Sequence, residues 1–174
     1  MGIRTVRTEG DECLRKVCKP VKSVSLRTRI LIEDMFDTMY ESGGVGLAAP
    51  QIGVLKRIVV MDTDDNQHVL INPQILEVSG EQTGYEGCLS IPGKSGIVTR
   101  PDYVKVKALN ERGEEYVLEG EGLLARCICH ECDHLDGILY SDKAEGGLIN
   151  NEDLPEDEEE ELYEDCLLYT SDAA

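Results

Sequence analysis

The chain lacks any run of apolar residues close to the roughly 18 that a helix needs to cross a bilayer. Residues 1–11 also lack the apolar core of a secretory signal peptide. Val6 stands where an N-myristoylation motif beginning at Gly2 requires Ser or Thr. Together these absences predict a cytoplasmic protein that neither spans a membrane nor is anchored to one.

The sequence is also poor in positive charge, with 17 Lys and Arg against 35 Asp and Glu, and its net charge is −18. Ten of the acids lie between Glu152 and Asp165 without a Lys or Arg among them, which leaves about −8 for the rest of the chain. A nucleic-acid-binding protein needs a basic surface that neutralises phosphates. The charge balance therefore argues against DNA, RNA and anionic membranes as ligands.

Seven cysteines are present, which is many for a chain of this length. In a reducing cytoplasm they are expected to be buried thiols, metal ligands or a nucleophile, and not a disulfide framework.

The length of 174 residues suits one domain. We expect the catalytic domain at residues 1–149, an acidic and mobile tail at 150–165, and a non-native segment at 166–174. The last segment reads CLLYTSDAA, which is similar to the translation of a transposon adapter used in DNA sequencing libraries. We leave it out of the fold prediction.

The spacing of apolar residues predicts two helices, at 25–42 with Ser25 as its cap and at 121–135 with Gly137 as its end. A glycine-rich loop is expected between them at 43–53. Short β-branched runs predict strands at 57–61, 69–71, 75–78, 104–109 and 114–118, the last two forming a hairpin. This pattern predicts an α+β fold, with antiparallel strands packed around a central helix that carries the metal motif and with an N-terminal helix.

That metal motif is His130-Glu131-Cys132-Asp133-His134, and it gives the strongest chemical signal in the sequence. Residues four apart on a helix share one face, roughly 5–6 Å between their β-carbons, so His130 and His134 can bind one ion. Glu131 can face the open coordination position and act as a general base beside an activated water. His68, the remaining histidine, lies in a polar segment and is expected to be solvated.

A hydrolytic metal site usually takes three protein ligands, so one more is needed. A metzincin-type third histidine would fall on Tyr140, which excludes that arrangement. The acidic tail offers carboxylates but no suitable helical pattern. The remaining candidates are cysteines: Cys132 on another face of the helix, Cys127 one turn before His130, and Cys88, which can approach from a separate loop or strand.

Three segments together resemble peptide deformylase, in the bacterial type of the family. They are Gly44-Val45-Gly46-Leu47-Ala48-Ala49-Pro50-Gln51, Glu86-Gly87-Cys88-Leu89-Ser90 and His130-Glu131-Cys132-Asp133-His134-Leu135. A lone HExxH motif is shared by many zinc proteases, but the three segments in this order are specific. Weaker similarity extends from Ile3 to about Tyr140.

The resemblance implies a metallohydrolase that removes the formyl group from formyl-methionine of new proteins and releases formate. Cys88, His130 and His134 would bind the metal, and metal-bound water would attack the formyl carbon with Glu131 as general base and acid. Gln51 and the backbone N–H of Leu89 would stabilise the oxyanion.

Other residues of the three segments are expected around the substrate. Glu86 would anchor a ligand, and Gly46 would let an extended peptide pair with the backbone. Leu123, Arg126 and Cys127 either pack in the core or border a methionine-sized pocket. The substrate-binding set is thus Gly44, Val45, Gly46, Glu86, Gly87, Leu123, Arg126 and Cys127.

A site with one thiolate and two imidazoles suits Fe(II), Zn(II), Ni(II) or Co(II), and the resemblance favours Fe(II) as the native ion. The implied partners are formyl-methionyl nascent peptides, and we expect a monomer. Two positions depart from the family. Cys129 stands where Gln is common, which adds a thiol open to oxidation. An acidic tail replaces the basic C-terminal helix of ribosome-associated members, which speaks against direct docking on ribosomal RNA.

Two rival functions fit the metal motif. A small zinc peptidase would use Glu131 in the same way but would cleave internal bonds of unformylated peptides. A metal-holding relative with only a binding role would be expected to have lost Glu131 or Gln51, and both are present.

Overall fold

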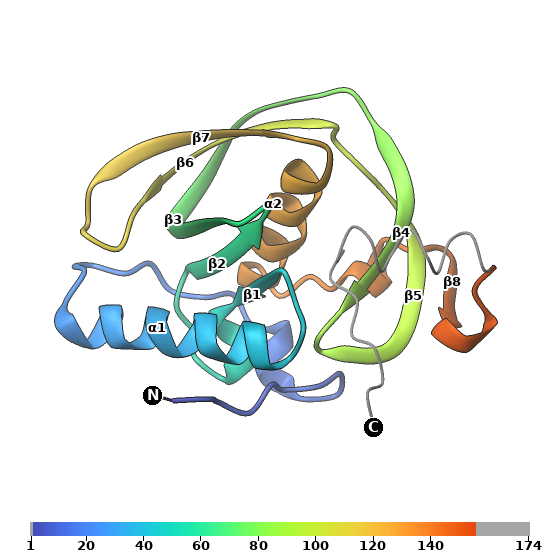
Figure 1. Ribbon diagram of the computed structural model, residues 1–174, viewed down its shortest axis with the longest axis horizontal. Coiled ribbons are helices and arrows are strands. Elements are labelled where there is room, and N and C mark those ends of the chain that lie inside the picture. Colours follow the sequence, from blue (N-terminus) through green and yellow to red (C-terminus); the bar gives the residue numbers. More distant parts are fainter. Residues whose placement is uncertain (1, 156–174) are drawn as a thin grey trace.

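The computed structural model describes residues 2–155, which form two antiparallel sheets and two α-helices (Figure 1). The larger sheet has the strand order β1-β2-β3-β6-β7 and the smaller the order β4-β5-β8. Strand bounds in the larger sheet are Gly46–Ala48 (β1), Ile58–Thr63 (β2), Asn66–Ser79 (β3), Tyr103–Leu109 (β6) and Glu115–Glu121 (β7). In the smaller they are Gln82–Cys88 (β4), Ile91–Arg100 (β5) and Glu145–Asn150 (β8). The predicted α+β class is confirmed.

Both helices follow the sequence prediction closely. Helix α1 spans Leu26–Glu41, and its Ser25 cap accepts a hydrogen bond from the N–H of Thr28 at 3.3 Å. Helix α2 spans Gly122–Leu135 and is followed by Gly137 at φ 74°. A β-carbon at Gly137 would lie 2.6 Å from the carbonyl oxygen of Arg15, so both the turn and the packing there require glycine.

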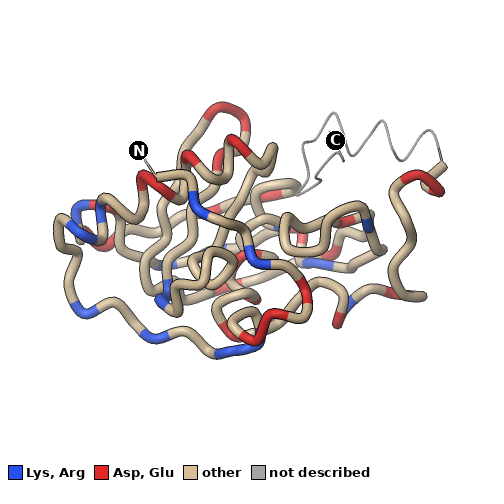
Figure 2. Tube along the Cα trace, turned by 90° about the horizontal axis from the view of Figure 1, so that it is seen from below, with Lys and Arg blue, Asp and Glu red and all other residues tan. Residues whose placement is uncertain are grey.

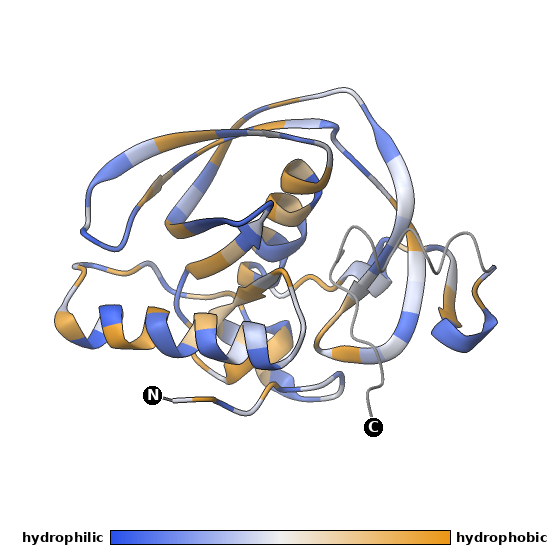
Figure 3. Ribbon diagram, in the orientation of Figure 1, coloured by the Kyte–Doolittle hydropathy of each residue, from blue (hydrophilic) through white to orange (hydrophobic). Residues whose placement is uncertain are grey.

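The two helices pack against opposite faces of the larger sheet, because strand side chains alternate between its faces. Helix α1 packs through Met35 and Met39 on a cluster that includes Ile58 and Val60. The residues next to Ile58 and Val60 in the strand point to the other face of the sheet, where they pack with α2. Figure 3 shows hydrophilic and hydrophobic residues alternating along α1, as a helix with one buried side requires.

The strands differ more from prediction than the helices do. The predicted strands 69–71 and 75–78 are parts of one strand, β3, whose pairing with β6 is irregular between Ile71 and Gln74. Asn72 lies in this irregular stretch at φ 52°, and its side chain bonds both the N–H and the carbonyl of Val21. The expected loop at 43–53 contains β1 and a 3-10 helix at Ala49–Ile52.

The smaller sheet was not predicted at all, and its composition explains why. Strand β5 contains Pro92, Gly93 and Gly96, and β8 contains two glycines, residues that are depleted in strands. These strands are stabilised by pairing with one another, which a local reading of sequence does not detect.

The packed chain continues beyond the expected end of the domain at residue 149. Strand β8 pairs Asn150 with Lys94, the hydroxyl of Ser95 donates to the side-chain oxygen of Asn151, and Leu154 is buried in the core. Apolar and polar contacts thus hold the first residues of the expected acidic tail to the fold. The rest of that tail and the segment 166–174 lie outside the described residues, so the predictions made for them stay predictions.

Charge is unevenly distributed over the molecule (Figure 2). Eight of the 17 Lys and Arg but only three of the 35 Asp and Glu lie in the first 29 residues, so that segment carries +5 and the remainder −23. Lys16, Lys19 and Lys22 recur at every third position and are all exposed. Among residues 2–155, no helix is long and apolar enough to span a membrane.

Candidate metal centre

Helix α2 carries the metal motif into the interior between the two sheets. The side chains of His130, Glu131 and His134 are buried, with 2% exposure at most. The two imidazole rings lie with their centroids 5.1 Å apart, as expected for residues one helical turn apart. The carboxylate of Glu131 lies between them, 3.6 Å from Nε2 of His130 and 3.9 Å from Nε2 of His134.

Cys88 completes the cluster from the end of β4. Its Sγ lies 3.3 Å from Nε2 of His134, and the ligand atoms of Cys88, His130 and His134 are all within 4.8 Å of one another. The irregular pairing of β4 and β5 between Glu86 and Cys88 re-aims the strand at this point. Of the three cysteines left open by the sequence, the structure therefore brings Cys88 to the histidines.

The other two candidate cysteines lie elsewhere. Cys127 is buried, with its thiol 4.0 Å from the carbonyl oxygen of Val45, and Cys132 packs in the apolar core. Burial raises the pKa of both thiols, so both stay protonated. The same holds for Cys129, whose pKa burial raises to about 11. A protonated thiol reacts more slowly with oxidants than a thiolate does.

The donor atoms fit a divalent metal ion. One sulfur and two imidazole nitrogens match the ligands of a hydrolytic site with an open position. Within residues 2–155, Nε2 of His130 and both carboxylate oxygens of Glu131 are buried and make no hydrogen bond. Buried polar atoms rarely lack partners, so these atoms point to a bound group.

Glu86 on β4 holds the imidazole of His130 from behind. Its Oε1 accepts a hydrogen bond from Nδ1 of His130 at 2.8 Å, and Arg100 and Arg126 donate to the same carboxylate. Burial would raise the pKa of Glu86, but His130 and Arg100 outweigh it and hold the pKa well below its ordinary value. Because an ionised carboxylate only accepts, Nδ1 carries a hydrogen and Nε2 faces the cluster. Burial lowers the pKa of His130, but Cys88 and Glu86 outweigh it and raise the pKa to about 10, so a bound ion would take the place of the proton on Nε2.

The ionisation of the remaining groups also suits a metal site. Burial, reinforced by His130 and Arg100, lowers the pKa of His134 well below its ordinary value, so its imidazole is neutral and free to ligate. Burial raises the pKa of Glu131 to about 7, although His130 opposes it. A carboxyl group with a pKa near neutrality can both take and return a proton.

Gln51 approaches the cluster from the 3-10 helix after β1. Its Oε1 accepts from the backbone N–H of Ala48 at 2.9 Å. That contact turns its amide Nε2 toward Ser90 at 3.1 Å and toward Sγ of Cys88 at 3.5 Å. The amide is therefore held as a donor facing the site, directly beside the segment that contains Leu89.

The glycines of the first motif let the backbone lie close to the site. A β-carbon at Gly46 would lie 2.9 Å from Sγ of Cys127 and 3.0 Å from Cγ of Glu131. At Gly44 it would lie 2.7 Å from Cδ1 of Leu89. Either position would displace a site residue if it carried a side chain, which explains the glycines.

Comparisons with known proteins agree with this geometry. Residues 3–148 match the family model described as polypeptide deformylase. The peptide deformylase of Agathobacter rectalis is 61% identical over 148 residues, 85% of this chain and 94% of that protein. The peptide deformylase of Lachnoclostridium phytofermentans is 55% identical and is covered over 100% of its length, with 92% of this chain.

The chain belongs to the polypeptide deformylase family. It is therefore an enzyme of the kind that removes formyl groups from nascent peptides. The crystal structure of peptide deformylase from Thermotoga maritima superposes with a TM-score of 0.82 at 42% identity, over 83% of this chain and 99% of that one. A structure from Ehrlichia chaffeensis in complex with actinonin gives 0.82 at 35% identity, over 84% and 91% of the two chains.

Two of the residues considered for the deformylase pocket have mainly internal contacts. Leu123 is partly buried against the core cluster of α2. Arg126 is 3% exposed, and its guanidinium donates to Glu86 and to the carbonyl oxygens of Val98 and Gln82.

Ser90 of the second family segment holds the amide of Gln51, a role that the sequence did not indicate. Two further residues near the deformylase site were not proposed for it from the sequence. Arg100 ends β5, a strand that the sequence did not predict. Tyr140 stacks on His130 with ring centroids 5.9 Å apart. Each contacts the site through pairing or packing across the fold, so spacing along the chain could not have indicated it.

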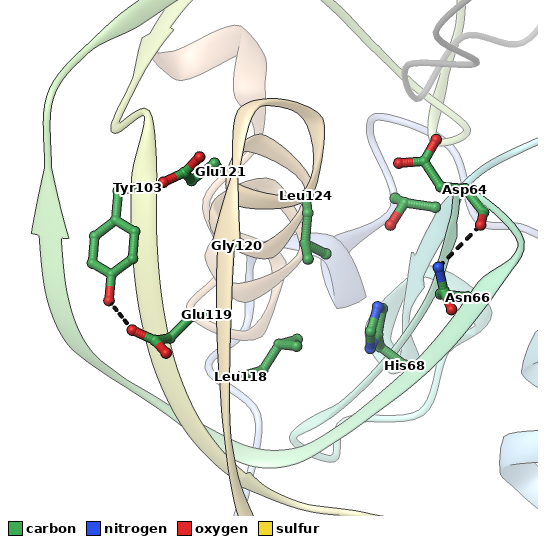
Figure 4. A pocket seen from close by; sticks show the side chains of 10 residues that line it. Asp64, Asn66, His68, Tyr103, Leu118, Glu119, Gly120, Glu121 and Leu124 are labelled. Carbon is green, nitrogen blue, oxygen red and sulfur yellow. Dashed lines mark hydrogen bonds between the residues drawn. The ribbon is translucent and has the colours of Figure 1, made fainter.

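His68 does not lie in a solvated turn, as the sequence suggested. It belongs to β3, is half-buried and lines a cavity of about 630 Å³ (Figure 4). Leu118 and Leu124 approach it from β7 and α2, and neither a ligand of the cluster nor Glu131 lines this cavity. The residues from Asn66 to Val69 were predicted as a turn because a short polar stretch at the start of a strand resembles one.

Proposed function

We propose that Cys88, His130 and His134 hold one divalent ion, Fe(II) in the native enzyme, and that Glu131 transfers protons in removal of the formyl group from formyl-methionine of new proteins. The observation that carries the proposal is that both carboxylate oxygens of Glu131, buried beside two imidazoles, lack a hydrogen-bond partner in the described part of the chain. The choice of Fe(II) over Zn(II), Ni(II) or Co(II) rests on the family resemblance, since the donor set accepts all four.

A bound divalent ion acidifies a water molecule and polarises the carbonyl of the substrate. Glu131 takes a proton from that water as the oxygen of the water adds to the formyl carbon. The amide of Gln51 and the backbone N–H of Leu89 donate to the formyl oxygen as it gains negative charge. When the carbon–nitrogen bond breaks, Glu131 returns the proton to the amine, so formate and a free N-terminal methionine leave.

The substrate is proposed to lie along the glycine-containing segment. The backbone of Gly44, Val45 and Gly46 and that of Gly87 would pair with an extended peptide. Leu123 and Cys127 would border its methionine side chain. The close approach required at Gly46 supports this arrangement, since only a bare backbone leaves room beside Glu131.

The test is formate release from a formyl-methionyl tripeptide by anaerobically purified protein and by Glu131→Gln, which preserves side-chain size. We expect the variant to lose about 10²–10⁴-fold in kcat at equal metal content, the range of general acid–base catalysis. Unformylated tripeptide and an internal-bond peptide serve as controls for peptidase activity. A fully metallated wild type that releases no formate contradicts the proposal, and so does a Glu131→Gln variant with wild-type kcat.

A further inference from the structure

We propose that Arg126 is a positioning residue for the metal centre, which acts through Glu86 on His130, and is not a contact for the methionine side chain. The inference rests on the proposed role of His130 as a ligand. It refines the sequence prediction, which placed Arg126 either in the core or at the pocket.

The contacts of Glu86 carry the first step. Its Oε2 accepts from Arg126 at 2.6 Å and from Arg100 at 2.9 Å, while Oε1 accepts from Arg100 at 3.0 Å and from His130 at 2.8 Å. All four side chains are at most 3% exposed. A buried carboxylate with every lone pair engaged cannot rotate, so the imidazole that it holds is fixed as well.

The two arginines are not equivalent. Arg100 also donates to Asp133 at 2.7 Å, and Asp133 accepts from Lys143 at 2.9 Å as well. Among the described residues, Arg126 forms its ion pair with Glu86 alone. Arg100 therefore shares its charge between two carboxylates, whereas Glu86 is the one carboxylate that Arg126 pairs with among the described residues.

Arg126 also fixes the separation between the two halves of the site. Its remaining hydrogen bonds go to the carbonyl oxygen of Val98 on β5 at 3.2 Å and to that of Gln82 on β4 at 3.4 Å. Strand β4 carries Cys88, and α2 carries the two histidines. One guanidinium thus ties the helix with His130 and His134 to the hairpin that presents the third ligand.

Gly84 on β4 lies beside the guanidinium. A β-carbon there would lie 3.6 Å from Nη2 of Arg126, an ordinary van der Waals contact. Three hydrogen bonds, to Glu86 and to two carbonyl oxygens, direct the guanidinium of Arg126 into the fold, and its side chain is only 3% exposed.

The experiment measures metal affinity by competition with a chelator, using Ni(II) as the probe, for wild type, Arg126→Met and Arg126→Lys. Loss of a group that bonds a metal-bound histidine typically costs 10–100-fold in metal affinity. Arg126 acts one contact further out and Arg100 still holds Glu86, so we expect the lower end of that range, about 10-fold, for Arg126→Met. The Lys variant keeps the charge but not the forked geometry, so it should fall between the two. KM of the formyl-methionyl tripeptide on metal-saturated protein should change by less than about 2-fold, because uniform substrate binding is untouched.

Arg57→Met is the matched control. Arg57 also fixes α2, by donating to the carbonyl of Leu135 at 3.1 Å and pairing with Asp136 at 3.0 Å, but it does not touch Glu86. Its loss should lower thermal stability without lowering Ni(II) affinity. Leu123→Ala, at the proposed pocket, should raise KM instead.

The outcomes separate this inference from the proposed function. Wild type that binds no Ni(II) contradicts the metal centre itself. Wild type that binds Ni(II), with Arg126→Met binding it equally and showing a raised KM, makes Arg126 a substrate contact and overturns the inference. Should Arg126→Met not fold, the Lys variant decides, since unchanged Ni(II) affinity together with a raised KM in that variant overturns the inference equally.

Discussion

Both faces of the larger sheet are buried, but the side chains that cover them differ in polarity. On the face of α1, the side chains of the buried cluster are apolar, with Met35 and Met39 at 0% exposure. On the face of α2, Glu131 is also at 0%, beside His130 and Cys127. Of the five buried side-chain atoms without a partner in the described chain, four belong to His130, Glu131 and His134. Burial alone therefore does not distinguish the residues of the site from those of the structural core. Buried polar atoms without a hydrogen-bond partner do distinguish them.

The largest effect on activity is expected at Gly46, where the sheet lies against α2. Gly46→Val would place methyl groups where Sγ of Cys127 and Cγ of Glu131 lie, so the carboxylate must move. We expect kcat/KM to fall about 100-fold, the effect of displacing a reacting group by about 1 Å. Steady-state deformylation with metal content determined in parallel measures it. Activity within about 2-fold of wild type would show that the carboxylate is not confined by this backbone.

The next largest effect is expected on the opposite face. Met35→Ala leaves a cavity in the apolar cluster under α1 and should lower the free energy of unfolding by about 2–5 kcal/mol. Activity per folded molecule should fall far less than in Gly46→Val, because Met35 packs on the face of the sheet opposite to His130, Glu131 and His134, and its cluster reaches the site only at Leu89. Denaturant titration and active-site-normalised rates measure the stability and the activity. A fall in kcat/KM equal to that of Gly46→Val would erase the distinction between the faces.

The smallest effect concerns His68, a titratable residue on the α2 face without a part in the site. Burial lowers its pKa below 6.5, although Asp62 opposes the shift. The unfolded chain then binds more protons than the folded one below that pH, so this contribution to stability is present above about pH 6.5 and is lost as the pH falls. Relative to His68→Gln, the wild type should lose stability between neutral and mildly acidic pH. An NMR titration giving His68 a pKa above 6.5 contradicts the assignment.

Local sequence patterns predicted the elements whose stability is local. The helices α1 and α2 have periodic apolar residues and capping residues at their ends, and the hairpin of β6 and β7 has a turn signal around Gly113. Strands β4 and β5 form a hairpin that closes at Cys88 and Ile91, and β8 joins β5 from far along the chain. The glycines in all three strands mask their character, so they were missed. The error at His68 has another cause, since the short polar stretch that begins β3 resembles a turn.

The residues of the site also differ in how far the sequence could predict them. The pairing of His130 with His134 follows from helical geometry alone, and Cys88 could be reached only as one of three cysteine candidates until resemblance was considered. The carboxylate of Glu86 and the guanidinium of Arg126 meet from residues 40 apart. Arg100 joins them from a strand that the sequence did not reveal. Ion pairs of this kind depend on the finished fold, and no spacing rule along the chain predicts them.

The exposed lysines at every third position of residues 16–22 form a short positive stretch on a chain whose net charge is −18. At physiological salt the potential of exposed charges is screened over about 8 Å. Beyond that distance a charged body meets little of the protein's field, and within it the lysine stretch presents the opposite sign to the rest of the chain.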